Sequence, residues 1–260
     1  MDLSGCSSDY EIRREPYPWG RAYIIEGIQE EPIILPSVTT VLQLLVNEKY
    51  ERLRNEFGDK KWDKILKDAA ERGNILHQML ETFIIEWEKD GDIETSLKKA
   101  QIFALEEERR GKEGYTEYQY KKIVERGRNL FWNFYHNKFW EEISEVLHNE
   151  IFLFTTFKGG WAGTADFIYF DQEKNLIVED FKSSTSPKDE EDILSYKLQI
   201  SAYMFMCAEK YGSVPKMGKI KVSNESTDEI QVFKVHDYEL KKYLGKFIEL
   251  LDKFKKIHNI

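Results

Sequence analysis

Two aspartates and a lysine lie close together in the sequence, in a pattern that suits hydrolysis of a phosphodiester. Asp166 ends the sequence Gly-Thr-Ala-Asp, thirteen residues precede Asp180, and Lys182 follows two positions later. Two carboxylates held side by side repel each other unless a cation lies between them, and hard divalent metal ions bind carboxylate oxygens. A lysine beside such a site would bring positive charge to a phosphate.

The residues around these three side chains predict a β-hairpin that brings them together. Segments 161–170 and 176–183 are rich in β-branched and aromatic residues, and the turn-like segment 171–175 separates them. In a hairpin centred on Glu173, the two aspartates lie directly opposite each other, with Cβ atoms roughly 4.5–5.5 Å apart. The lysine emerges on the same face. A surface hairpin with scattered charges shows the same pattern, and a one-residue bulge would change the register.

Composition is that of an ordinary globular protein. The 260 residues are 41% hydrophobic and 33% charged. No apolar run approaches the roughly 20 residues that span a bilayer, so we expect no membrane partner. Segment 1–10 lacks an apolar signal core and an arginine-rich amphipathic pattern, so we expect a cytoplasmic protein, consistent with a phage or bacterial cell.

Charge and cysteine content exclude further classes. The net charge of −9 argues against a protein that coats nucleic acid by bulk electrostatics, although a local basic channel is compatible with it. Two cysteines, Cys6 and Cys207, cannot supply the four thiolates of an iron–sulfur cluster. Basic residues of the first half that could line a channel, or simply face solvent, are Lys60, Lys61, Arg109, Arg110, Lys112, Lys121, Lys122, Arg126 and Arg128.

The order of the expected elements indicates an α/β (α+β) protein with a mixed central β-sheet flanked by helices. Helices are expected from Ser37, over 62–89, 94–110 and 116–140, from about 189 to 211, and over 237–257. Strands are expected over 147–156, 161–170, 176–183, 217–223 and 230–235, with one further strand at 21–26. We therefore expect an irregular segment 1–35, a helical subdomain 36–146 and a sheet-containing core 147–260 within one integrated domain.

Two helical stripes carry polar residues that could join the hairpin. His77 and Glu81 share one helix face, on which Gly73 would allow close approach of another group. Gln199 and Tyr203 share a stripe on a mostly apolar helix. A hydrogen-bonded histidine and amphipathic residues at the edge of the core would give the same patterns.

Taken in chain order, these motifs resemble those of the PD-(D/E)XK nuclease superfamily, and within it RecB-like exonucleases related to the mitochondrial genome maintenance and phage exonucleases. The resemblance covers roughly residues 36–205. The matching motifs are Pro36-Ser-Val-Thr-Thr-Val-Leu42, Arg72-Gly73 with His77 and Glu81, Gly163-x-x-Asp166, Asp180-x-Lys182-Ser-Ser and Gln199-x-x-x-Tyr203.

The resemblance implies a restriction-endonuclease-like core and a site for Mg²⁺ or Mn²⁺, without an iron–sulfur cluster. The implied metal ligands are His77, Asp166, Asp180 and the main-chain carbonyl of Phe181, with Glu150 as a further candidate. Lys182 would act beside Asp166 and Asp180 in catalysis. The implied substrate-binding residues are Gln199, Tyr203, Ser183, Ser184 and Arg72.

The expected function is that of a metal-dependent DNA exonuclease acting on single strands or DNA ends, in DNA repair or recombination. The chain would then act with a helicase or with replication and recombination proteins as partners. Two alternatives stay open: a structure-specific or restriction-type endonuclease, and a catalytically silent nucleic-acid-binding subunit. Intact Asp166, Asp180 and Lys182 argue against the silent form.

Overall fold

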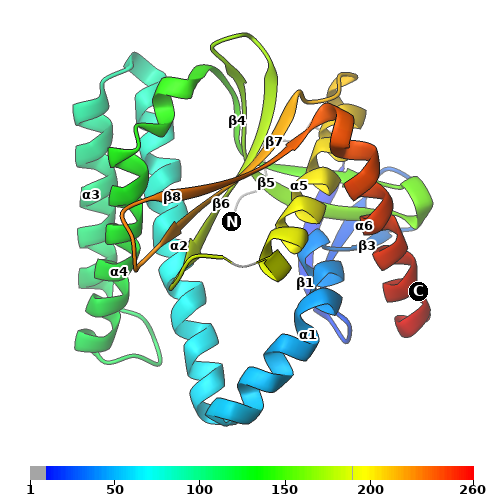
Figure 1. Cartoon of the computed structure of the whole chain (residues 1–260), viewed down its shortest axis with the longest axis horizontal. Helices are drawn as coiled ribbons and strands as arrows, with labels where there is room; N and C mark the ends of the chain where they lie inside the picture. The colour runs from blue at the N-terminus through cyan, green and yellow to red at the C-terminus, as the bar shows by residue number, and fades with distance from the viewer. Residues whose placement is uncertain (1–9, 189) are drawn as a thin grey trace.

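A five-stranded mixed sheet forms the centre of the protein (Figure 1). The computed structural model describes residues 10–188 and 190–260. In spatial order the strands are β4 (Ile143–Thr155), β5 (Trp161–Asp171), β6 (Leu176–Ser184), β7 (Met217–Asn224) and β8 (Ile230–His236). Neighbouring strands are antiparallel except β6 and β7, which are parallel and joined through helix α5 (Glu190–Tyr211). The expected fold class is therefore confirmed.

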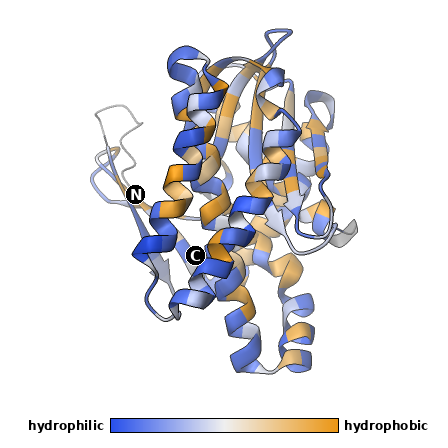
Figure 2. Cartoon of the chain, turned by 90° about the vertical axis from the view of Figure 1, so that its left-hand side faces the viewer, coloured by the Kyte–Doolittle hydropathy of each residue, from blue (hydrophilic) through white to orange (hydrophobic). Residues whose placement is uncertain are grey.

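Helices cover both faces of the sheet. One layer contains α1 (Val38–Phe57), α5 and α6 (Asp237–His258), and the other contains α2 (Asp59–Asp90), α3 (Ile93–Arg110) and α4 (Glu117–His136). Short 3₁₀ turns, η1 (Phe139–Glu142) and η2 (Phe157–Gly159), flank β4. The helices are amphipathic, with mixed hydrophilic and hydrophobic positions along each ribbon (Figure 2). Among the described residues, we find no helix with the length and apolarity needed to cross a membrane.

Most predicted elements occur within a few residues of their expected bounds. Ser37 caps α1, because its Oγ accepts a hydrogen bond of 3.0 Å from the Thr40 N–H. The last helix of the N-terminal half ends at His136, four residues before the expected end, and β4 begins at Ile143. The first strand of the core thus starts before the proposed boundary at 146/147, and the division into subdomains stays a prediction.

The structure over residues 10–35 contradicts the expectation of an irregular segment 1–35, but it confirms the strand expected at 21–26. Residues 10–36 contain a three-stranded antiparallel sheet, β1 (Glu11–Tyr17), β2 (Gly20–Glu26) and β3 (Ile33–Pro36), whereas 1–9 lie outside the described residues. Tyr23 and Ile25 of the middle strand pack against Phe152 of β4, which stabilises this small sheet. Tertiary burial decides the structure here, because prolines and charges obscure the strand pattern of β1 in the sequence.

The hairpin of β5 and β6 has the predicted register. Phe167 pairs with Glu179 and Phe170 with Leu176, which is the pairing of a hairpin centred on Glu173. The ladder stops at the Phe167–Glu179 pair, although β5 extends back to Trp161 and β6 extends forward to Ser184. Beyond this pair β5 stays paired with β4 and β6 with β7. The two strands therefore diverge where the aspartates stand, which leaves room for side chains between them.

A buried charged network supports the hairpin from its other face. Lys221 Nζ lies 3.2 Å from Glu179 Oε1 and 3.4 Å from Glu142 Oε2. The Tyr169 hydroxyl donates to Glu179 Oε2 at 2.9 Å and accepts from Lys219 Nζ at 3.0 Å. Lys221 and Glu179 are 2% and 1% exposed, so each charge is stabilised by its protein partners and not by water.

We expect the substitution Lys221→Met to lower the free energy of unfolding by about 3 kcal/mol, because it leaves the Glu179 carboxylate buried without its cation. Urea denaturation would measure the difference. Lys234→Met is the matched control, since Lys234 is exposed on the neighbouring strand β8 and has no ion pair among the described residues. Equal stabilities of the two variants would contradict the prediction.

Candidate active site

A cavity of about 740 Å³ opens where β5 and β6 diverge. Its walls come from β1 and β2, the start of α1, one face of α2, strands β4 to β6, and α5, with α3 and α4 at one end. The acidic and basic side chains that line its centre are His77, Glu81, Glu150, Asp166, Asp180 and Lys182. The cavity thus gathers residues from segments separated by more than a hundred positions in the sequence.

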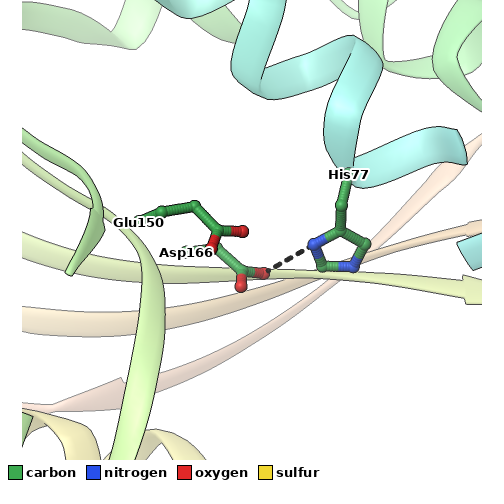
Figure 3. Close-up of side chains that lie close together, drawn as sticks. All are labelled: His77, Glu150 and Asp166. Atoms are coloured by element: carbon green, nitrogen blue, oxygen red, sulfur yellow. Dashed lines mark ion pairs between the residues drawn. The ribbon is translucent and has the colours of Figure 1, made fainter. Parts of the chain in front are cut away.

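Three possible metal ligands form a cluster in this cavity (Figure 3). His77 reaches in from α2, Glu150 from β4 and Asp166 from β5, and their ligand atoms all lie within 4.8 Å of one another. His77 Nδ1 is 3.4 Å from Asp166 Oδ2. The Phe181 main chain fixes this pair, because its N–H donates to Asp166 Oδ2 at 2.7 Å and its main chain also hydrogen-bonds His77.

Glu150 reaches the cluster through a local distortion of β4. It has a φ of 57°, although the flanking residues Asn149 and Ile151 pair regularly with Phe167 and Ala165 of β5. A left-handed conformation costs a non-glycine residue roughly 1–2 kcal/mol. Such strain inside a strand is typical of functional sites, where a side chain must be aimed in a direction that regular pleating does not allow.

Asp180 lies beside the cluster and makes different contacts. It forms an ion pair with Lys182, and its Oδ1 accepts a hydrogen bond of 3.0 Å from the Gln199 amide. The Asp180 side chain is 2% exposed, and its Oδ2 is the atom that pairs with Lys182 Nζ. The structure thus brings Asp180 to the cavity wall but turns its carboxylate toward Lys182 and α5.

Burial perturbs every acid of this site. It raises the pKa of Glu150 to about 7, and the nearby Asp166 adds to the effect. Burial also raises the pKa of Asp166 to about 6 against the opposing effect of Lys182, and it raises the pKa of Asp180 to about 6 together with repulsion from Asp166. Such perturbation of several neighbouring acids is typical of functional sites.

The two basic groups of the site are shifted in opposite directions. Burial lowers the pKa of His77 to about 4, and the charge of Lys182 adds to this, so the imidazole is neutral and can offer a lone pair. Burial works to lower the pKa of Lys182 as well, but Asp180 and Asp166 outweigh it and hold the pKa above its ordinary value.

Gln199 and Tyr203 line the cavity but are almost fully buried, at 4% and 3% exposed. Gln199 Nε2 lies 3.0 Å from Asp180 Oδ1 and 3.4 Å from the Tyr203 hydroxyl. The Tyr203 ring packs against Gly163, where an added Cβ would lie 2.7 Å from Cε1 of the ring. Gln199 therefore positions Asp180, and the substrate-binding role that the resemblance implies for Gln199 and Tyr203 stays a prediction.

We expect Gly163→Ala to displace the Tyr203 ring, with a loss of about 1–3 kcal/mol in unfolding free energy and reduced nuclease activity, because the ring cannot stay in place beside a Cβ. Thermal denaturation and nuclease assays would measure both effects. Gly245→Ala is the control, because an added Cβ meets nothing within 4 Å there and alanine favours a helix. Wild-type stability and activity of Gly163→Ala would contradict the prediction.

Three residues that the resemblance implied as substrate-binding lie away from the cavity. Arg72 is 3% exposed and pairs with Glu225 at 3.1 Å. Ser183 packs against Gly73 of α2, with its Oγ 3.3 Å from the position of an added Cβ. The Ser184 hydroxyl is bound within a local turn, where it donates to the Ser186 carbonyl. Their contacts with the rest of the fold are structural ones in this arrangement.

Several residues of the cavity wall were not among the predicted site residues. Arg14, Arg21 and Tyr23 come from the N-terminal sheet, of which only the strand at 21–26 was predicted. Of the basic residues proposed for a channel, Arg110 and Lys112 line the cavity, but each pairs with a glutamate, Glu107 and Glu71 respectively. The alternation of β2 was the only available signal for Arg21 and Tyr23, because residues two apart share a strand face.

The donor set fits a hard divalent cation. One neutral imidazole and the carboxylates of Glu150 and Asp166 converge in the cluster, with Asp180 adjacent to it. Carboxylate oxygens with one imidazole suit Mg²⁺ or Mn²⁺, and a cation would offset the burial and the mutual repulsion that raise the pKa values of these acids. The carbonyl of Phe181 as a further ligand stays a prediction.

A mixed sheet whose hairpin carries acidic and lysine side chains into one cavity is the arrangement of a nuclease core. The chain belongs to the PD-(D/E)XK nuclease superfamily, which it matches over residues 48–258. Among solved structures it is similar to a provisionally assigned exonuclease from Eubacterium rectale, with 14% identity, a TM-score of 0.46, and coverage of 72% of this chain and 68% of that one. It is also similar to the protein SSO0001, with 14% identity, a TM-score of 0.35, and coverage of 54% and 67% respectively. No match was found among curated proteins.

Proposed function

We propose that this nuclease is a divalent-metal-dependent DNA exonuclease that hydrolyses phosphodiester bonds in single strands or at DNA ends. The observation that carries the proposal is the convergence of Asp166, Asp180 and Lys182 with His77 and Glu150 in one cavity. The family supplies nuclease chemistry, and the cavity supplies acidic ligands beside the partly buried ammonium group of Lys182.

The proposed roles follow from the contacts of each side chain. His77, Glu150, Asp166 and Asp180 would hold the metal, which would polarise the scissile phosphate and favour ionisation of the attacking water. Lys182 would offer its ammonium group to the phosphate, where negative charge increases during the reaction. Gln199 would keep Asp180 in place through its amide hydrogen bond, and the Phe181 N–H would do the same for Asp166.

Cleavage of linear and closed circular single-stranded DNA would test the proposal. We expect degradation of end-labelled linear DNA in Mg²⁺ or Mn²⁺, none in EDTA, and no cleavage of circles. Cleavage of the circles would instead indicate an endonuclease on the same fold. Absence of metal-dependent products from any DNA would support the silent nucleic-acid-binding subunit and overturn the catalytic proposal.

A further inference from the structure

We propose that Arg14, Arg21 and the first turn of α1 form a second phosphate-binding subsite, which holds a phosphate of the nucleic-acid strand other than the scissile one. The inference rests on the proposed nuclease function and adds a positioning element to it. The subsite belongs to the N-terminal sheet and the start of α1, outside the superfamily match over 48–258. It lines the same cavity as the acidic cluster.

The two arginines lie on one face of the N-terminal sheet. Arg14 of β1 pairs with Tyr23 of β2, and Pro16 pairs with Arg21. Arg14 and Arg21 are therefore diagonal neighbours, roughly 7–8 Å apart in such a ladder. Both line the cavity together with Tyr23, which lies on the same face because it is two residues from Arg21. The geometry directs two positive side chains to one wall.

Arg21 is attached firmly to the start of α1. Its N–H donates to Thr40 Oγ1 at 3.0 Å, and its carbonyl accepts from the Ser37 N–H at 3.0 Å. Gly20 makes this contact possible, because its φ is +125° and an added Cβ would lie 2.5 Å from Thr40 Cγ2. Ser37, Val38 and Thr39 also line the cavity, so the positive end of the helix dipole lies beside the arginine.

Neither arginine has a carboxylate partner, which distinguishes the pair from the basic residues around it. Within residues 10–188 and 190–260, no salt bridge involves Arg14 or Arg21, whereas Arg13 on the other face of β1 pairs with Glu15 and Glu26. Two unpaired cations on one strand face repel each other. An anion between them would remove this repulsion, and a phosphodiester suits the planar, multidentate donors of arginine.

The cavity therefore has a division of charge. Its centre is acidic and suits a metal ion, whereas the wall at β1 and β2 is basic and suits a phosphate. Arg14 and Glu150 line the same cavity, so the two regions adjoin. A strand whose scissile phosphate lies beside Lys182 can place another phosphate against the arginines, which would fix the path of the strand through the cavity.

Binding and kinetics of the double variant Arg14→Gln/Arg21→Gln would test this inference. Binding of a labelled single-stranded oligonucleotide is measured in EDTA over a series of KCl concentrations, and KM and kcat are measured in Mn²⁺. We expect Kd and KM to rise on the order of 10-fold, and the slope of log K against log[salt] to fall by about 0.7 to 1. The effect should be smaller on thymidine 5′-monophosphate p-nitrophenyl ester, which offers a single phosphate.

Arg13→Gln is the matched control, because it removes an arginine from the same strand but from the face that is paired with glutamates. It should bind DNA with the wild-type Kd and slope. A double variant that behaves like Arg13→Gln, or that loses affinity without a change in slope, would overturn the subsite. Failure of the wild-type protein to cleave DNA would overturn the proposed function instead, since the binding measurements in EDTA need no catalysis.

Discussion

Asp180→Asn should abolish both cleavage and tight binding of a divalent metal. The substitution preserves the shape of the side chain, and the asparagine Oδ1 can still accept the hydrogen bond from the Gln199 amide. It removes the negative charge beside the acidic cluster. We expect cleavage to fall on the order of 10³-fold or more, and the affinity for Mn²⁺ to fall at least about 10-fold. Nuclease assays and calorimetric titration with Mn²⁺ would measure the two effects.

The control for this prediction comes from the same hairpin. Glu173→Gln removes one negative charge at the exposed turn between β5 and β6, outside the cavity. It should leave cleavage and Mn²⁺ affinity unchanged. Equal activity of Asp180→Asn and Glu173→Gln would show that Asp180 has no part in the chemistry. The catalytic site would then consist of the cluster of His77, Glu150 and Asp166.

The register of the hairpin could be predicted because its information is local. Turn residues around Glu173 and the alternation along both strands are sufficient to predict the pairing from Phe170–Leu176 to Phe167–Glu179, although the ladder ends there and the two aspartates are not themselves paired. The same reasoning identified Ser37 as a helix cap. The sequence did not reveal that the strands diverge just beyond Phe167 and Glu179, because that depends on the pairing of each strand with a different neighbour.

The contacts of Arg72 are determined by its position around the helix axis, which the resemblance to the motif does not specify. Arg72 precedes His77 by five residues, which places it about 140° around the helix, on another face from the cavity. Its partner Glu225 lies just after β7 and is distant in sequence, so no local signal indicated the ion pair. A shared motif thus identified the helix correctly, while the direction of each side chain depended on its position around the axis.

Long-range packing explains the rest of what the sequence could not predict. The sheet of residues 10–36 is stabilised through Tyr23 and Ile25 against β4, and its first strand carries charges on both faces. The left-handed conformation of Glu150 could not be predicted from the sequence either, because glutamate has no preference for it. Both features shape the cavity wall. The reactive residues could therefore be predicted from the sequence more fully than the elements that hold them in place.

Lys182→Met should separate metal binding from cleavage. Lys182 pairs with Asp180 and lies beside the acidic cluster, where its charge opposes a metal cation and favours a phosphate. We expect cleavage to fall on the order of 10²–10³-fold, because a positive donor at the developing charge is lost. Once the aspartates are ionised, well above their pKa of about 6, the affinity for Mn²⁺ should equal or exceed that of the wild type.

The pH dependence of this variant is itself informative. Lys182 lowers the pKa of Asp180 against the effects of burial and Asp166, so its removal raises that pKa further. Protons then compete with the metal up to a higher pH, and Mn²⁺ affinity in Lys182→Met should decline earlier than in the wild type as the pH is lowered.

Lys182→Arg keeps the charge and should keep the wild-type pH dependence of Mn²⁺ binding, although its planar group does not reproduce the geometry of the ammonium. Loss of Mn²⁺ binding at high pH in Lys182→Met would contradict the separation, because it would mean that Lys182 holds the metal ligands in place instead of acting on the phosphate.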